Sequence, residues 1–220
     1  VGERAAINLN NISSTDLSRG YHLSTPDSFN EVNSYIAEIS LINSEKQKIK
    51  NNQRIRIHLG TKEVMARISL IKEYTEDSIN KIMAYIKLEN KLVLGIGDRF
   101  IIRHYSPVIT IGGGIVFDKC CNKNWKLIKE VALDFIGKDL YDRIYHIINN
   151  ICSLSPLEIS EVQSRLNISK EDFDEILNND ARYLVVSYNS FSWVLANSKI
   201  VLLKKKIISI LDDYHSKNPM

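Results

Sequence analysis

The chain has 220 residues, of which 44% are hydrophobic and 25% are charged. This composition allows a buried core in one large domain or two small ones, and it excludes intrinsic disorder and fibrous repeats. The net charge is only +3, yet residues 1–125 hold 17 basic and 13 acidic side chains, while residues 126–220 hold 12 and 13. A polyanion is therefore expected to meet the first half of the chain, because phosphates attract lysine and arginine.

No apolar run approaches the roughly 20 residues that a membrane-spanning helix needs, and the first residues show no signal-peptide pattern. We therefore expect a soluble, cytoplasmic protein without a membrane partner. The three cysteines, Cys120, Cys121 and Cys152, are an odd number and lack C-x-x-C or Cys/His ligand spacing. They predict neither a disulfide framework nor a metal site.

The first half of the chain, over residues 34–118, has a hydrophobic period of two, which is typical of half-buried strands. Residues 54–59 alternate polar and apolar side chains strictly. Five further stretches repeat the pattern between glycines, prolines and polar residues, namely 35–42, 64–70, 82–88, 99–105 and 108–117. About six short strands at this spacing predict a closed antiparallel β-barrel over residues 30–118, since closure removes exposed sheet edges.

In the second half the period becomes 3.6, which indicates amphipathic helices. Two are predicted, over residues 125–136 and 141–151. Ser155 precedes Pro156, and Glu158 lies three residues after the serine. This capping box predicts that a third helix begins there.

Further along the chain, Ser169 predicts the cap of a fourth helix. A hairpin over residues 183–188 and 191–195 and a closing helix over residues 199–215 follow. Helix, turn, helix and hairpin together predict a winged-helix domain. The predicted fold class is therefore mixed, with an all-β antiparallel barrel followed by an α-rich winged helix.

No catalytic constellation is visible in the sequence. The three glycines at positions 112–114 are not a phosphate-binding loop, because no lysine and hydroxyl residue follow at the required distance. They indicate instead two strands that approach closely. No Ser/His/Asp order and no histidine cluster occurs, so we expect no catalytic residue, metal site or cofactor in this chain.

Basic residues in the barrel are the best functional candidates. They lie on one face of a predicted strand or in the adjoining hairpin: Arg54, Arg56, His58, Lys62 and Arg67. Such a face could meet a phosphate backbone, although alternation alone favours an ordinary solvated surface. Arg99 and Arg103 are expected to form ion pairs instead.

The predicted recognition helix of the winged helix, residues 170–179, is acidic. Lys170 stands against four acidic residues, which are Glu171, Asp172, Asp174 and Glu175, for a net charge of −3. Such a helix would repel phosphates where DNA readers place arginine and lysine. A winged-helix DNA-binding regulator therefore remains an alternative, while a role in packing or spacing is favoured.

Three motifs carry a family resemblance. Residues 54–67 read R-x-R-x-H-L-G-T-x-E-V-x-A-R, residues 97–107 read G-D-R-F-I-I-R-x-Y-S-P, and residues 110–114 read T-I-G-G-G. In this combination the chain resembles the bacterial selenocysteine-specific elongation factors, the SelB family. The resemblance assigns structural roles to the following motif residues: Gly60, Thr61, Glu63, Asp98, Arg99, Arg103, Gly112, Gly113 and Gly114.

The resemblance extends to both ends and implies a division into domains. Residues 1–26 are similar to the closing strands of the second barrel of translational GTPases, and residues 214–219 are similar to the entry to a second winged helix. The implied parts are a truncated second barrel (1–26), the third-domain barrel (30–118), a junction (119–125), the first winged helix (126–214) and the start of a second one (215–220).

The family's factor binds GTP, with Mg²⁺, in a GTPase domain that would precede this chain, and delivers selenocysteyl-tRNA to the ribosome at UGA codons. Its last winged helix holds the mRNA hairpin that marks the codon. The resemblance implies that the barrel packs on its own GTPase domain and contacts the tRNA through the five basic residues named above, while the winged helix is a spacer. The chain itself would be no enzyme.

Two alternatives of other classes stay open, the DNA-binding regulator and a purely structural protein-interaction module. Burial of Arg54 and Arg56 in ion pairs would favour the structural module. Another translational GTPase, such as the initiation factor 2 gamma subunit, is disfavoured because a winged helix follows the barrel. The sequence does not predict the oligomeric state.

Overall fold

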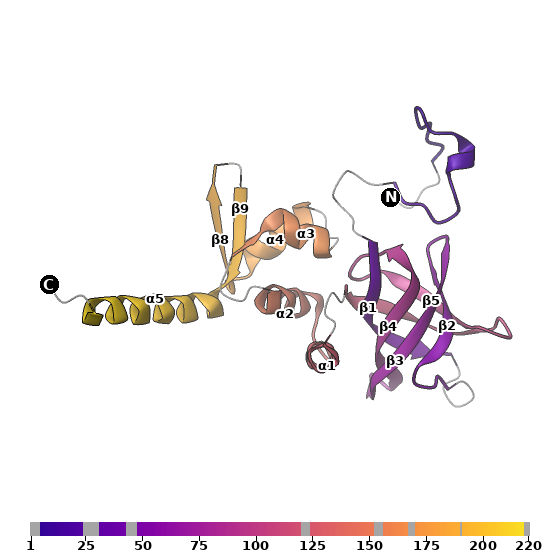
Figure 1. The fold of residues 1–220 in the computed structure, drawn as a ribbon. Helices are drawn as coiled ribbons and strands as arrows, with labels where there is room; N and C mark the ends of the chain where they lie inside the picture. Colours follow the sequence, from indigo (N-terminus) through magenta and orange to yellow (C-terminus); the bar gives the residue numbers. More distant parts are fainter. Residues whose placement is uncertain are drawn as a thin grey trace.

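The computed structural model describes residues 5–23, 31–42, 48–119, 124–151, 156–166, 170–189 and 191–217. A closed β-barrel forms the first half of the chain, and helices with a small three-stranded sheet form the second half. Figure 1 shows the barrel beside this helical region, with the last helix running away from both toward the C-terminus.

Six antiparallel strands close the barrel in the order β1-β4-β3-β2-β5-β6. Their bounds are β1 (Glu31–Leu41), β2 (Gln53–Leu59), β3 (Lys62–Glu76), β4 (Ile79–Val93), β5 (Arg99–His104) and β6 (Thr110–Asp118). The predicted barrel is therefore confirmed. The polar stretch at residues 75–80 was expected to separate two strands, but most of it is paired, because β3 and β4 continue to a tight turn at Asp77 and Ser78.

The barrel interior is filled by the apolar side chains of alternate positions. Along β2, for example, Ile55 and Ile57 are fully buried and Leu59 is nearly so, while the residues between them face outward. Each such side chain stabilises the fold by about 1.5–3 kcal/mol relative to an exposed one. The period of two thus decides which side chains remain available on the outer surface.

The glycine run of β6 allows the close approach that the sequence indicated. A Cβ added at Gly114 would lie 2.5 Å from the carbonyl oxygen of Glu38 on β1 and 2.6 Å from Cζ of Phe100 on β5. Gly112 and Gly113 are likewise crowded by backbone oxygens of neighbouring strands. Without Cβ atoms, β6 can sit between β1 and β5.

The helical region contains the expected helices and hairpin, together with a short strand that was not expected. They are α1 (Trp125–Asp134), α2 (Leu140–Ile151), β7 (Leu157–Glu158), α3 (Ile159–Leu166), α4 (Lys170–Asn179), β8 (Tyr183–Tyr188), β9 (Phe191–Ala196) and α5 (Asn197–Lys217). The strands form a sheet in the order β7-β9-β8. Gly137, with φ +71°, follows the end of α1, where a residue with positive φ commonly ends a helix.

The predicted start of the third helix is wrong. Leu157 and Glu158 are a short strand that pairs with Val194 and Trp193 of β9, and α3 begins only at Ile159. Hydrogen bonding to β9 therefore overrides the local capping signal. The predicted cap residues Ser155 and Ser169 lie outside the described residues.

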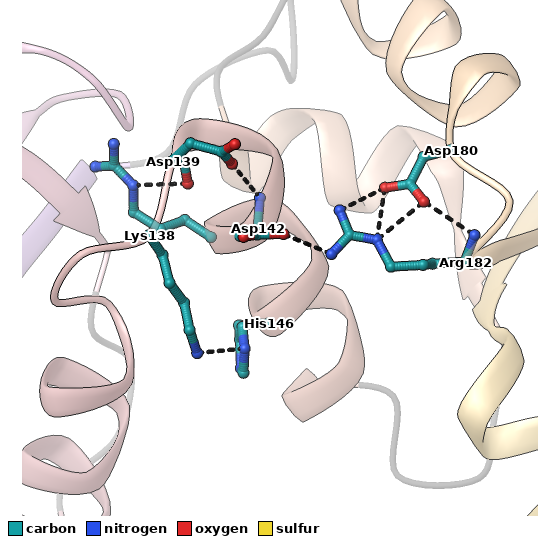
Figure 2. A network of polar contacts seen from close by, with 7 residues as sticks. Lys138, Asp139, Asp142, His146, Asp180 and Arg182 are labelled. Carbon is teal, nitrogen blue, oxygen red and sulfur yellow. Dashed lines mark hydrogen bonds and ion pairs between the residues drawn. The ribbon is translucent and has the colours of Figure 1, made fainter.

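A network of ion pairs joins α2 to the beginning of β8. The Arg182 guanidinium donates to Asp142 at 2.6 Å and to Asp180 at 2.9 Å, and Asp142 in turn has its backbone N–H bonded to Asp139 (Figure 2). The bonds from Arg182 hold the pKa of Asp180 below its ordinary value. The same view shows Lys138 beside His146.

The N-terminal stretch differs from the expectation. Within residues 5–23 the structure contains one 3-10 turn, Ser14–Asp16, and no strand, so closing strands are not formed there. A strand needs a neighbouring strand for its backbone hydrogen bonds, and this stretch instead contacts the barrel through Arg19, whose Nε donates to the Thr61 carbonyl at 3.1 Å. At the other end α5 is continuous to Lys217, across the expected boundary at residues 214–215.

The last helix, α5, has no buried residue. Large apolar side chains on it are half exposed or more, including Val201, Ile208, Ile210 and Tyr214. Among the described helices, none is both long and apolar enough to cross a membrane.

We expect Gly114→Ala to lower the free energy of unfolding by about 1–3 kcal/mol, because added atoms in a closely packed interior cost that much. Chemical denaturation measures the change. Asn90→Ala, at an exposed position of β4, is the matched control and should change stability by less than about 0.5 kcal/mol. Equal effects of the two substitutions would show that the glycine is not needed for the approach of β6 to its neighbours.

Candidate nucleic-acid interface

Outward-facing cations gather on four adjacent strands of the barrel. The register places Arg54 opposite Arg67, Arg67 opposite Lys87 and Arg56 opposite Arg103. These pairs cross the neighbouring strands β4, β3, β2 and β5. We call this surface the basic face and define it by Arg54, Arg56, His58, Arg67, Lys87 and Arg103, together with Glu63 and Glu89.

Two carboxylates of the basic face bind its central arginines. Arg54 donates from Nε at 2.7 Å and from Nη2 at 2.6 Å to the two oxygens of Glu89. These bonds raise the pKa of Arg54 and lower the pKa of Glu89. Arg56 forms an ion pair with Glu63, and Nε2 of His58 lies 3.6 Å from the same carboxylate. Glu63 lies on β3 and Glu89 on β4, so both partners come from other strands than the arginines.

Ion pairing does not bury the arginines. The side chain of Arg54 is 38% exposed and that of Arg56 is 23% exposed. The basic face has five arginine and lysine side chains against the two carboxylates Glu63 and Glu89, so it keeps a net positive charge. Surface ion pairs in this setting contribute little to stability, and their members stay accessible to another anion.

An aromatic ring holds the two central arginines in place. The guanidinium carbons of Arg54 and Arg56 lie 4.6 Å and 5.5 Å from the centroid of the Tyr105 ring. Arg56 also donates from Nε to the Tyr105 carbonyl at 3.3 Å, and Arg103 donates from Nη2 to the Val108 carbonyl at 3.4 Å. The loop after β5 thus orients three of the cations. Cation–π contact with an exposed ring is worth about 0.5–1 kcal/mol.

The structure separates one predicted contact residue from the others. Arg54, Arg56, His58 and Arg67 share the basic face, whereas Lys62 lies at the end of the barrel with its Nζ 5.9 Å from the Tyr21 ring centroid. On β3 the even positions Val64, Ala66 and Ile68 are buried, so Lys62 belongs to the inward-facing set, and only its place at the strand end keeps it partly exposed. Sequence spacing alone did not distinguish these two sets.

The motif residues take mainly structural positions. The Asp98 carboxylate accepts a hydrogen bond from the Gly95 N–H at 2.6 Å and closes the turn before β5. Gly60 has φ +55° in the β2–β3 turn beside Thr61. Arg99 is exposed, and no ion pair joins Arg99 or Arg103 to another described residue, so the expected ion pairs do not form there. Glu63 is the motif residue that pairs with Arg56.

Sequence reasoning missed three members of the basic face, namely Lys87, Arg103 as a surface cation, and Glu89. Lys87 and Glu89 lie on β4, and only the pairing of strands in the barrel brings them next to Arg67 and Arg54. The alternation of β4 could have shown that both face outward, but not which strand lies beside β4. Within the described part of the chain no group of three His, Cys, Asp or Glu side chains could hold a metal ion.

Comparison with known proteins finds a family model that is similar to the barrel. Residues 36–123 match the family model described as "Selenocysteine-specific elongation factor, beta-barrel domain". All of the chain aligns at 20% identity with 35% of a selenocysteine-specific elongation factor from Desulfomicrobium baculatum. The chain therefore spans about a third of the length of this relative.

A solved structure of such a factor is similar to this chain in fold. The crystal structure of the bacterial selenocysteine-specific elongation factor EF-Sec matches 96% of this chain with a TM-score of 0.58 and 17% identity, over 32% of its own length. At that identity the likeness establishes the fold. The apo form of the elongation factor SelB from Methanococcus maripaludis matches 48% of the chain and 26% of its own, with 19% identity and a TM-score of 0.40.

The Glu89 carboxyl should titrate below its ordinary pKa and return toward it in Arg54→Ala, because that substitution removes two charge-assisted hydrogen bonds. Since the folded-state pKa is depressed, stabilisation by the pair is present above the unfolded-state pKa and is lost as the pH falls through the folded-state value. NMR titration of the carboxyl carbon measures this. Lys126→Ala, remote from the basic face, is the control. The same Glu89 pKa in wild type and Arg54→Ala would contradict the pairing.

Proposed function

We propose that this chain, which carries the β-barrel domain of the selenocysteine-specific elongation factors, is the middle part of such a translation factor and that its barrel contacts the selenocysteine tRNA. The match of residues 36–123 to the family's barrel supports the first statement. The observation that supports the second is the net positive basic face, in which accessible arginines lie in neighbouring strands.

RNA binding at this face would be independent of sequence. Arg54 and Arg56 are positioned by Tyr105 to present planar guanidinium groups, which bind phosphate oxygens in the same bidentate way as carboxylates. An RNA phosphate would therefore compete with Glu89 and Glu63 for these groups. Contacts of this kind, with phosphates and 2′-hydroxyls, fix the orientation of the RNA without reading bases.

The helical region is proposed to be the first winged helix of the factor and a spacer rather than an RNA reader. This proposal is supported by the element order, in which the helices α2, α3 and α4 precede the hairpin β8–β9 and β7, between α2 and α3, adds a third strand to the sheet. The chain segment of α4 carries a net charge of −3, which disfavours a groove of nucleic acid. Helices with apolar side chains on several sides are normally buried, so we propose that α5 packs into a following winged helix, whose start lies well before residue 215.

The proposed assignment leaves catalysis to another part of the factor. GTP and Mg²⁺ would be bound by a GTPase domain, on which the barrel packs, and the mRNA hairpin would be bound by a later winged helix. The chain would work in the cytoplasm, on the ribosome, and would contribute no catalytic residue of its own.

The test is filter binding of selenocysteine tRNA to the full-length factor over a range of salt concentrations. Arg54→Ala and Arg56→Ala together should weaken binding, and each lost phosphate contact should reduce the salt slope of log affinity by about 0.7–0.9. Glu89→Gln should have the opposite effect, because it removes the carboxylate that competes for Arg54. Lys126→Ala, an exposed cation of α1, is the control.

Unchanged affinity and salt slope in the double arginine variant would refute the assigned contact. The structural-module alternative is favoured by one observation, the exposed apolar loop residues Tyr105, Val108 and Ile109 next to the paired arginines. Under that alternative the same variant would leave tRNA binding intact and would weaken the packing of the barrel on another protein domain.

A further inference from the structure

The barrel and the helical region share one apolar cluster. Outward-facing barrel residues, among them Ile36 of β1, Met83 of β4 and Phe117 of β6, are at most 4% exposed. They belong to the same cluster as Ala132 of α1 and Phe135, the C-cap residue of that helix, both of which are fully buried. Residues on the outside of a small barrel are normally hydrated, so their burial here requires the helices. The two parts are therefore continuous through a core rather than joined only by a linker.

Aromatic contacts order this interface. The rings of Phe117 and Phe135 meet edge to face with centroids 6.1 Å apart, and those of Tyr85 on β4 and Trp125 on α1 do so at 5.9 Å. Such pairs are worth about 0.5–1.5 kcal/mol beyond their buried area. The Ile96 N–H of the barrel also donates to the Leu166 carbonyl at the end of α3, at 3.3 Å. The barrel is thus in contact with two helices, α1 and α3.

A charged residue of α2 lies at the edge of the interface. The guanidinium carbon of Arg143, on α2, is 4.1 Å from the centroid of the Phe117 ring. Within the helical region, the backbone N–H and the Nε of Arg143 both donate to the Asp139 carbonyl at 3.1 Å, which fixes the position of the side chain. Arginine stacks on aromatic faces through its planar guanidinium, which lysine does not have. Arg143 therefore connects α2 directly to the barrel.

The barrel surface around Arg143 is acidic. Tyr74 donates to Glu38, and Lys81 bridges Glu38 and Glu76, which leaves two carboxylates for one lysine on this part of the barrel. Burial lowers the pKa of Arg143, and the nearby Glu38 and Asp139 act in the opposite direction. A cation at this position is thus matched by a net negative barrel surface, which would favour one docking orientation over others.

From this geometry we infer that the barrel and the helical region form one rigid unit, in which Arg143, stacked on Phe117 opposite Glu38 and Glu76, sets the angle of the helical arm. The direction in which α5 leaves the molecule is then determined by the barrel. The apolar cluster supplies the binding energy of the interface, while the stacked cation selects its orientation. This inference does not depend on RNA binding, so either can fail without the other.

The experiment is backbone ¹⁵N relaxation of the whole chain in solution. In wild type we expect the amides of the barrel and of the helical region to report one common rotational correlation time. In Arg143→Met, which keeps the apolar stem but removes the guanidinium, the two parts should tumble with separable correlation times. Arg143→Lys should lie between, because it keeps the charge but loses the stacking. Lys126→Met removes an exposed charge of α1 and is the matched control, with no change expected.

Phe117→Leu approaches the same contact from the barrel side and should reproduce the effect of Arg143→Met. Retained dispersion of the barrel amides in each variant will show that the barrel is still folded. Two correlation times in wild type would overturn the inference of a rigid unit. One common correlation time in both Arg143→Met and Phe117→Leu would overturn the role of the stacked pair.

Discussion

The alternation of side chains in a closed barrel is the constraint on which the rest of the structure depends. Because the interior has room only for apolar side chains, every second residue of each strand must face outward, and the register then decides which outward residues become neighbours. In this chain the outer surface is divided between two uses. Polar residues of β2, β3, β4 and β5 form the basic face, and apolar residues such as Ile36 and Met83 pack against the helices.

The central arginines of the basic face are held in place by neighbouring residues of the barrel. Arg54 and Arg56 are held by Tyr105 and by carboxylates, which keeps their guanidinium groups ordered in the absence of a ligand. Ordering beforehand reduces the entropy lost on binding, while competition with Glu89 and Glu63 reduces affinity. Under the proposed function, an interface of this type suits a ligand that must be held and released.

At the junction with the helices the outer surface of the barrel is apolar and buried instead of charged and exposed. There the barrel buries aromatic and aliphatic side chains against α1, and the charged groups lie at the rim, where Arg143 meets Phe117. Apolar area is not directional, whereas a stacked guanidinium facing carboxylates has a preferred position. Rigidity of the arm thus comes from a combination in which neither component alone is sufficient. The exposed apolar residues of α5 lie at the far end of this arm.

The sequence by itself determined the strands, the helices and the glycine run of β6, because each has a local period or a local steric requirement that neighbouring residues reveal. It also determined that Arg54, Arg56 and His58 share a face, since alternation within one strand needs no partner. Only the tertiary structure decided that Glu89 binds Arg54, that Lys62 lies elsewhere, and that Leu157 pairs with β9 instead of starting a helix. These contacts join residues distant in sequence through a register that no single segment encodes. The physical reason is that pairing energy between strands depends on which strand lies adjacent, and closure of the whole barrel settles that choice.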